Sequence, residues 1–341
     1  MASSISRFVA GVTCALALAA GVAAQTQING AGATFPFPIY SKWFAEYNKL
    51  HADIRINYQS VGSGAGIQQL IKQTVFFGAT DGPMTDDQLQ SAPGKILHFP
   101  TVLGAVVPIY SIPGVPQELK FTGAVLADIF LGKITKWNDP AIAKLNGGVN
   151  LPGTDIVVVH RSEGSGTTYI WVDFLSKISP EFRKAVGVAA SVKWPTGIGG
   201  KGNEGVAGSV TQTPGAIGYV ELIYALQNKI AYGTVQNSSG AFVRASVESV
   251  TSAAAAAVSA MPPDFRVSIT NPPGADAYPI SSFTWLLFYE NPKDKPKART
   301  MVDFMKWALS DGQKAASDLG YAPLPSEVVA LEMEALKKIK L

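Results

Sequence analysis

A join between an apolar run and a helical pattern recurs four times in this chain, and it constrains the fold more than any other feature. The apolar runs lie near residue 28 and over residues 54–58, 76–78 and 156–159, and a loop of small or polar residues follows each one. Short apolar runs that alternate with helical patterns are typical of α/β proteins, in which helices cover a largely parallel sheet. We therefore expect an α/β fold whose functional loops lie at the carboxyl ends of the strands.

The first two joins are rich in glycine. Residues 30–35 lead from a strand at Ile28 into a helix, in which apolar side chains at three-to-four-residue spacing predict one buried face. The expected face comprises Ile39, Trp43, Phe44, Tyr47 and Leu50. In the second join, alternation over residues 54–58 predicts a strand, and residues 62–66 lead into a short helix that contains residues 67–71.

The last two joins carry charged side chains. The third strand ends at Asp81, before a helix that Thr85 is expected to cap. The fourth strand, residues 156–159, is a continuous β-branched run of the kind found in buried parallel strands. Its loop, residues 160–167, combines an arginine, a glutamate and several hydroxyls before the next helix.

Three of the loops place a hydroxyl residue close to the start of a helix, namely Thr34, Ser63 and Ser165. A helix N-terminus presents unpaired N–H groups and the positive end of the macrodipole, and glycines let an anion approach the backbone closely. Loops at one edge of a sheet can converge, so the three termini together predict a single anion site. The alternative is that each hydroxyl only caps its helix and each glycine only forms a turn.

Two charged residues sharpen this prediction. Arg161 ends a buried strand, where its guanidinium can hold two ligand oxygens at once; an ion pair with Glu163 is the alternative, and the two roles are compatible. Asp81 would repel an anion unless the anion donates a hydrogen, which protonated phosphate can do and sulfate at neutral pH cannot. The alternative role of Asp81 is to cap the turn before Gly82.

Several other classes of protein are not supported by the sequence. A net charge of +3 with only 16% charged residues gives no basic excess for nucleic-acid binding. Residues 197–202 spell G-x-G-x-x-G, but Trp-Pro-Thr at 194–196 stands where a dinucleotide loop needs a strand, and Gly202 stands where a P-loop needs Ser or Thr. The side chain of His160 is expected to point away from the loop hydroxyls, so no catalytic triad is predicted.

The first two dozen residues have the pattern of an export signal. Arg7 supplies a positive charge, an apolar stretch follows, and small residues precede Gln25. We expect a signal peptide over residues 1–24, cleaved near Ala24/Gln25. The single cysteine, Cys14, lies inside it and lacks the flanking pattern of a lipid-attachment site. The mature chain would then have no cysteine, which suits a periplasmic protein without disulfides or a zinc site.

Six strings of the sequence are far less generic than a lone glycine motif. They are residues 30–36 (GAGATFP), 128–133 (DIFLGK), 193–195 (KWP), 197–205 (GIGGKGNEG), 214–221 (PGAIGYVE) and 319–322 (LGYA). Through them the chain resembles the periplasmic phosphate-binding proteins of phosphate-specific ABC transporters, the PstS family. The resemblance implies a two-domain type II clamshell with a two-strand hinge, which closes on its ligand. The implied boundaries are 25–104 and 275–341 for domain I and 105–274 for domain II.

The resemblance also implies which residues contact phosphate. They are Thr34, the N–H of Phe35, Ser63, Asp81, Arg161, Ser165, Gly166 and Thr167. Glu163 departs from the family pattern, which often has aspartate there, and we expect it to orient Arg161 without touching the ligand.

By this resemblance the function is capture of phosphate without chemistry and delivery to membrane permease subunits that a cytoplasmic ATPase drives. We expect a periplasmic monomer that is not an enzyme, needs no cofactor or metal and binds no nucleic acid. One alternative is a receptor for another protonated oxyanion such as arsenate. The other is a phosphatase on the same scaffold, for which the sequence offers neither a metal cluster nor an activated nucleophile.

Overall fold

The computed structural model describes residues 25–115, 118–258 and 261–341, so the expected signal peptide and Cys14 lie outside the described residues. The strands are β1 (Thr26–Gly32), β2 (Ile54–Ser60), β3 (Phe77–Thr80), β4 (Ile96–Ser111), β5 (Lys120–Phe121), β6 (Val157–Arg161), β7 (Ile198–Gly200), β8 (Ala216–Glu221), β9 (Ala231–Tyr232), β10 (Thr234–Gln236), β11 (Phe242–Val243) and β12 (Ser281–Tyr289). The α-helices are α1 (Phe37–Leu50), α2 (Ser63–Ile71), α3 (Asp86–Ser91), α4 (Gly123–Phe130), α5 (Pro140–Leu145), α6 (Gly166–Ile178), α7 (Pro180–Ala185), α8 (Gly202–Gln212), α9 (Leu222–Gln227), α10 (Val247–Val258), α11 (Lys295–Ala308) and α12 (Ser326–Leu336), and short 3-10 helices span Asp311–Ala315 and Ser317–Leu319.

The predicted α/β fold is confirmed, and each of the four joins is present as a strand followed by a helix. One sheet runs through the molecule in the order β2-β1-β3-β12-β4-β8-β6-β7, with β9 beside β4. Strand β1 pairs in parallel with β2 and β3, and β6 pairs in parallel with β7 and β8. Within each half, parallel pairing brings the loops after these strands to one edge, as the sequence predicted. The two sets of strands run in opposite directions, because three antiparallel pairings separate β3 from β8.

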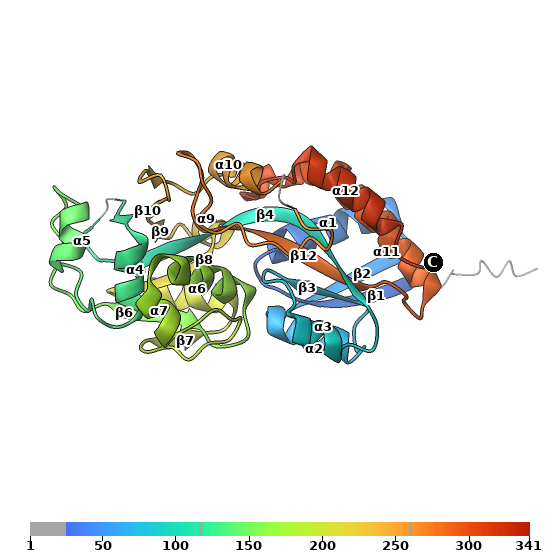
Figure 1. Ribbon diagram of the computed structural model, residues 1–341, viewed down its shortest axis with the longest axis horizontal. Helices are drawn as coiled ribbons and strands as arrows, with labels where there is room; N and C mark the ends of the chain where they lie inside the picture. The colour runs from blue at the N-terminus through green and yellow to red at the C-terminus, as the bar shows by residue number, and fades with distance from the viewer. Residues whose placement is uncertain (1–24, 116–117, 259–260) are drawn as a thin grey trace, which may run out of the picture.

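The 16-residue strand β4 belongs to both halves of the sheet. Its residues 96–105 pair antiparallel with β12, and residues 106–111 pair antiparallel with β8. Figure 1 shows the two halves side by side along the long axis, with β4 and the chain that leads into β12 crossing between them. This is the two-domain type II arrangement with two crossing segments.

The two halves repeat one topological unit. In the first half β1 lies between β2 and β3, and in the second half β6 lies between β7 and β8 in the same order. Each of these six strands leads on to the start of a helix. An acidic residue stands at the end of the third strand of each unit. Asp81 directly follows β3, and Glu221 is the last residue of β8.

Helix α1 carries the apolar face that the sequence predicted, with one exception. Trp43 is fully buried, whereas Leu50 is 63% exposed and was wrongly placed on that face. The buried stripe ends one turn earlier with Tyr47, whose ring contacts Phe304 and Trp307 of α11. Leu50 is the last helical residue, and its side chain is left largely uncovered.

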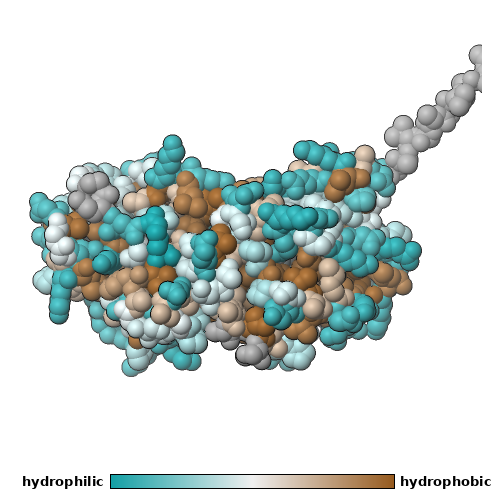
Figure 2. Space-filling view, turned by 90° about the horizontal axis from the view of Figure 1, so that it is seen from above, coloured by the Kyte–Doolittle hydropathy of each residue, from teal (hydrophilic) through white to brown (hydrophobic). Residues whose placement is uncertain are grey.

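The molecular surface is mixed in character. Figure 2 shows hydrophilic residues spread over both halves of one face, with hydrophobic residues between them. None of the described helices combines the length and the apolar character needed to span a lipid bilayer.

Trp43→Ala should lower the free energy of unfolding by about 3–5 kcal/mol, because it leaves a cavity in the core and removes the indole hydrogen bond to Gly312 O at 2.7 Å. Leu50→Ala, on the same helix, is the matched control and should change it by less than about 0.5 kcal/mol. Denaturant unfolding followed by circular dichroism measures both. Equal losses would contradict the different burial of the two side chains.

Candidate anion-binding site

The polar side chains predicted for the site are buried and come from both halves of the sheet. Their exposed fractions are 3% for Thr34, 1% for Ser63, 1% for Asp81, 4% for Arg161, 0% for Ser165 and 0% for Thr167. Thr34 follows β1, Asp81 follows β3 and Ser63 opens α2, all in the first half. In the second half, Arg161 ends β6, and Ser165 and Thr167 lie at the start of α6. The structure therefore brings together residues from separate joins in one interior region.

Ser63 connects the two halves directly. Its Oγ accepts hydrogen bonds from the backbone N–H of Asp81 at 3.3 Å and of Gly166 at 3.1 Å. Beside it, the N–H of Gly64 donates to the carbonyl of Gly164 at 2.9 Å. A Cβ on Gly64 would lie only 3.1 Å from the Gly164 Cα, so the two loops meet backbone to backbone.

The Arg161 guanidinium is held by two side chains and still has donors to spare. Its Nε donates to Glu163 Oε1 at 3.0 Å, its Nη2 pairs with the same oxygen, and its Nη1 donates to Thr167 Oγ1 at 3.2 Å. These contacts use three of the five N–H groups of a guanidinium, which leaves one on each terminal nitrogen. The predicted ion pair is thus present without excluding a bidentate ligand contact.

Glu163 is placed to fix the orientation of Arg161. Although burial acts to raise it, the pKa of the Glu163 carboxyl lies below its ordinary value, because Arg161 and the N–H of Gly202 stabilise the charged form. The Gly202 N–H donates to Oε1 at 3.0 Å. The Glu163 stem also reaches the other half of the molecule, since a Cβ on Gly62 would lie 3.0 Å from Glu163 Cγ.

Asp81 faces the N-terminus of α6 from the opposite half. Its Oδ1 accepts a hydrogen bond from Thr284 Oγ1 at 2.8 Å, and its Oδ2 would lie 2.6 Å from a Cβ built on Gly166. Burial raises the pKa of the carboxyl to about 7, although the Thr284 hydrogen bond and the charge of Arg161 act to lower it. A carboxyl with this pKa can exchange a proton with a ligand at neutral pH.

Two tyrosines anchor the turn that carries Thr34 and Phe35. The hydroxyl of Tyr224 donates to Thr34 O at 2.6 Å, and the hydroxyl of Tyr321 donates to Phe35 O at 2.6 Å. Tyr224 belongs to α9 in the second half, so this turn is also a contact between the halves. The shape of the turn is fixed because both carbonyl oxygens are bonded.

Helix capping explains one of the three predicted hydroxyls. Ser165 is the N-cap of α6, and its Oγ accepts from Thr168 N at 3.0 Å. The caps of α1 and α2 are Pro36 and Gly62, neither of which makes a side-chain capping bond. Thr34 and Ser63 instead bond to the second half, so capping does not account for them.

Two residues that the sequence analysis missed complete the site. Asn203, in the first turn of α8, is fully buried and donates through Nδ2 to the Oγ1 atoms of Thr34 at 2.7 Å and Thr167 at 3.2 Å. A signal for it existed, because Gly202 opens α8 after β7 as Gly166 opens α6 after β6. Thr284, the donor to the buried carboxyl, lies inside an apolar strand and has no local signal.

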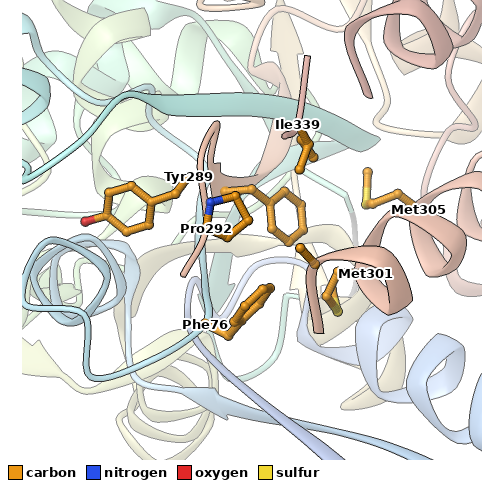
Figure 3. A pocket seen from close by; sticks show the side chains of 8 residues that line it. Phe76, Tyr289, Pro292, Met301, Met305 and Ile339 are labelled. Atoms are coloured by element: carbon orange, nitrogen blue, oxygen red, sulfur yellow. The ribbon is translucent and has the colours of Figure 1, made fainter. Parts of the chain in front are cut away.

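The gap at the end of β12 is too small to compete with this site. The gap in Figure 3, between the end of β12 and α11, has a volume of about 10 Å³ and is lined mainly by apolar side chains. It is a packing gap of at most one water molecule. Among the described residues, no group of three or more His, Cys, Asp or Glu side chains is arranged to hold a metal ion.

The chemistry of the site is that of an anion receptor with one exception. The spare guanidinium donors, the hydroxyls and the N-terminus of α6 all favour negative charge. Asp81 is the exception, because a carboxylate can accept a hydrogen from an anion but repels an anion that has none to share.

Comparisons with known proteins identify the family and support the fold. A family model described as a PBP superfamily domain matches residues 19–312. The phosphate-binding protein PstS of Pasteurella multocida is 49% identical over 90% of this chain and 88% of its own length. PstS of Haemophilus influenzae is 45% identical over 90% of this chain and 92% of its own. A solved phosphate-binding protein from Stenotrophomonas maltophilia, only 18% identical, has a TM-score of 0.69 over 91% of this chain and 94% of that chain, and it supports the fold.

The raised pKa of Asp81 predicts a pH dependence of stability. The folded protein holds this proton up to about pH 7, whereas the unfolded chain releases it near 3.8, so the folded state binds more protons between these values. Stability should therefore fall as pH rises through this window and level off above it.

Asp81→Asn removes the titrating carboxyl. Between pH 4 and 8 the free energy of unfolding of the wild type should therefore fall by up to roughly 4 kcal/mol relative to that of the variant. Urea unfolding of both proteins across that range, without added oxyanions, measures the difference. Parallel pH profiles would show that the carboxyl is not perturbed.

Proposed function

Because this chain belongs to the PstS family of phosphate-binding proteins, we propose that it captures inorganic phosphate and delivers it to the permease of an ABC transporter. The observation that carries the proposal is a buried set of donors around one carboxyl that can accept a proton. The proposed contacts are Thr34, Phe35, Ser63, Asp81, Arg161, Ser165, Gly166 and Thr167, with Glu163 behind Arg161.

Each group has a distinct part in capture. The two spare donors of Arg161 match two phosphate oxygens, and its planar fork fixes their orientation. Hydroxyl and backbone N–H donors replace the water that phosphate loses on entry. Asp81 receives the hydrogen of protonated phosphate, so an anion without a hydrogen leaves a buried acceptor facing a negative oxygen.

Closing of the clamshell completes the site. We place domain I at 25–104 and 275–341 and domain II at 105–274, and the change of β4 from β12 to β8 as its partner supports the first boundary. The bonds of Ser63 to Gly166 and of Gly64 to Gly164 join the domains. Phosphate bound between the domains would favour the closed form, which the permease then accepts.

Family membership also supports a setting for this activity. In this proposal the chain is exported by a signal peptide cleaved near Ala24/Gln25 and acts as a periplasmic monomer. It performs no catalysis, and its partners are permease subunits driven by a cytoplasmic ATPase.

Calorimetric titration of phosphate-stripped mature protein tests ligand choice. Phosphate should bind in the micromolar range or tighter and sulfate at least about a thousandfold more weakly, because sulfate offers no hydrogen to Asp81. Asp81→Asn should lower the ratio of the sulfate to the phosphate dissociation constant at least about tenfold, since an amide can also donate a hydrogen bond to an anion.

Asp155→Asn is the control, because Asp155 is an exposed carboxylate whose side chain retains 78% of its accessible surface. It should leave the ratio unchanged. Comparable affinity of wild type for phosphate and sulfate would refute the role of Asp81. A parallel titration with arsenate, which has the charge and hydrogen of phosphate, identifies the other oxyanion that this chemistry admits.

The Arg161–Glu163 pair predicts an order of effects. Glu163→Asp keeps the charge and should weaken phosphate binding by no more than about tenfold, or ~1.4 kcal/mol. Arg161→Lys loses the planar fork and should cost at least ~2 kcal/mol. Titration of both variants gives the order, and a larger loss for Glu163→Asp would show that Glu163 contacts the ligand or controls closure.

A further inference from the structure

Both polar atoms of the Asn203 side chain are hydrogen-bonded, and two of the partners are hydroxyls of the phosphate site. Its side-chain Nδ2 donates to Thr34 Oγ1 at 2.7 Å and to Thr167 Oγ1 at 3.2 Å. Its backbone N–H donates to the same Thr34 oxygen at 3.3 Å. Its Oδ1 accepts the backbone N–H of Glu221 at 2.8 Å. The residue is fully buried, so these protein groups take the place of water.

The Glu221 bond fixes which way the amide points. A backbone N–H can only donate, so the oxygen of Asn203 must face Glu221 and the NH₂ group must face the two threonines. A flipped amide would set two donors against each other at Glu221 and leave its oxygen facing the hydroxyls. The donor direction at the threonines is therefore decided by chemistry.

Both threonine hydroxyls receive two N–H donors. Thr34 Oγ1 accepts from the side chain and the backbone of Asn203, and Thr167 Oγ1 accepts from Asn203 and from Arg161 Nη1. A hydroxyl has two acceptor lone pairs and one hydrogen. With both lone pairs occupied, the remaining hydrogen is all that each hydroxyl can offer to a ligand. Both lone pairs of Ser63 Oγ are occupied in the same way, since this oxygen accepts hydrogen bonds from two backbone N–H groups.

We propose that Asn203 is a positioning residue of the phosphate site, which occupies the lone pairs of Thr34 and Thr167 and so turns their hydroxyl hydrogens toward the anion. This inference rests on the proposed function. Without this amide each hydroxyl keeps one donor, the backbone N–H of residue 203 for Thr34 and Arg161 for Thr167, and its second lone pair can turn toward the anion and repel a phosphate oxygen. Asn203 thus acts on affinity through the threonines and not by contact with the ligand.

A double-mutant cycle on phosphate affinity tests this role. Asn203→Ala should weaken phosphate binding at least about tenfold in the wild-type background. In Thr34→Val and in Thr167→Val backgrounds, where a hydroxyl that Asn203 orients is missing, the same change should weaken phosphate binding by a factor at least about three times smaller. The Thr167 cycle is the more telling one, because Thr167 and Asn203 lie in the same half of the molecule. A residue that only held the two halves together would show no coupling to Thr167.

A second variant separates the donor role from packing. Asn203→Leu keeps most of the side-chain volume without adding a charge but loses the NH₂ group, so it should bind phosphate no more tightly than Asn203→Ala. A purely structural role predicts that the larger side chain restores the affinity. Asn146→Ala is the matched control, since Asn146 is also buried but bonds only to backbone groups of Lys120 and Ile142. It should lower stability and leave affinity unchanged.

The outcomes distinguish this inference from the function beneath it. A wild-type protein that fails to bind phosphate would overturn both. A wild-type protein that binds phosphate, with Asn203→Ala within threefold of it or with equal costs in all three backgrounds, would overturn the role of Asn203 alone. Unfolding curves without phosphate confirm that each variant is folded.

Discussion

The burial of Arg161 and Asp81 in one interior region is the constraint on which the other features of the site depend. A buried charge is costly unless hydrogen bonds or an opposite charge compensate it. Glu163 and Thr167 supply those partners for Arg161, and Thr284 supplies one for Asp81. The remaining cost appears as the raised pKa of Asp81, which is the property that suits it to a protonated anion. In the proposed function, the groups that compensate the buried charges are therefore also the groups that select the ligand.

The repeated topological unit explains how so many donors reach one place. In each half three parallel strands end at the same edge, and each end leads to a helix start. Strand β4 runs through both halves and sets the two edges against each other. The two units are not chemically equivalent, because Asp81 faces the site whereas Glu221 caps α9 through its side chain and holds Asn203 through its backbone. The third strand of each unit thus serves a different purpose.

The direction of hydrogen bonds matters in this site as much as their number. Hydroxyl groups can donate or accept, so a cluster of serine and threonine has no preference between anions and cations by itself. Backbone N–H groups, Asn203 and Arg161 remove that ambiguity because they can only donate to these oxygens. The result is a region of neutral hydroxyls that behaves as a donor surface, with one carboxyl as its acceptor.

The sequence by itself determined the elements and the chemistry of the individual loops. Strand and helix periods are local properties of the backbone, so the four joins, the buried face of α1 and the position of Arg161 at a strand end could be read from short windows. The prediction from a short window was wrong for Leu50, because only the packing of the whole chain decides that this position stays 63% exposed. Only the tertiary structure decided which donors meet. Asn203 lies 169 positions from Thr34 and Thr284 lies 203 from Asp81, because sheet order and the crossing at β4 bring them together. No local pattern encodes such pairings, since the Thr284–Asp81 contact follows from the pairing of β12 with β3 and the Asn203–Thr34 contact follows from the packing of the two halves.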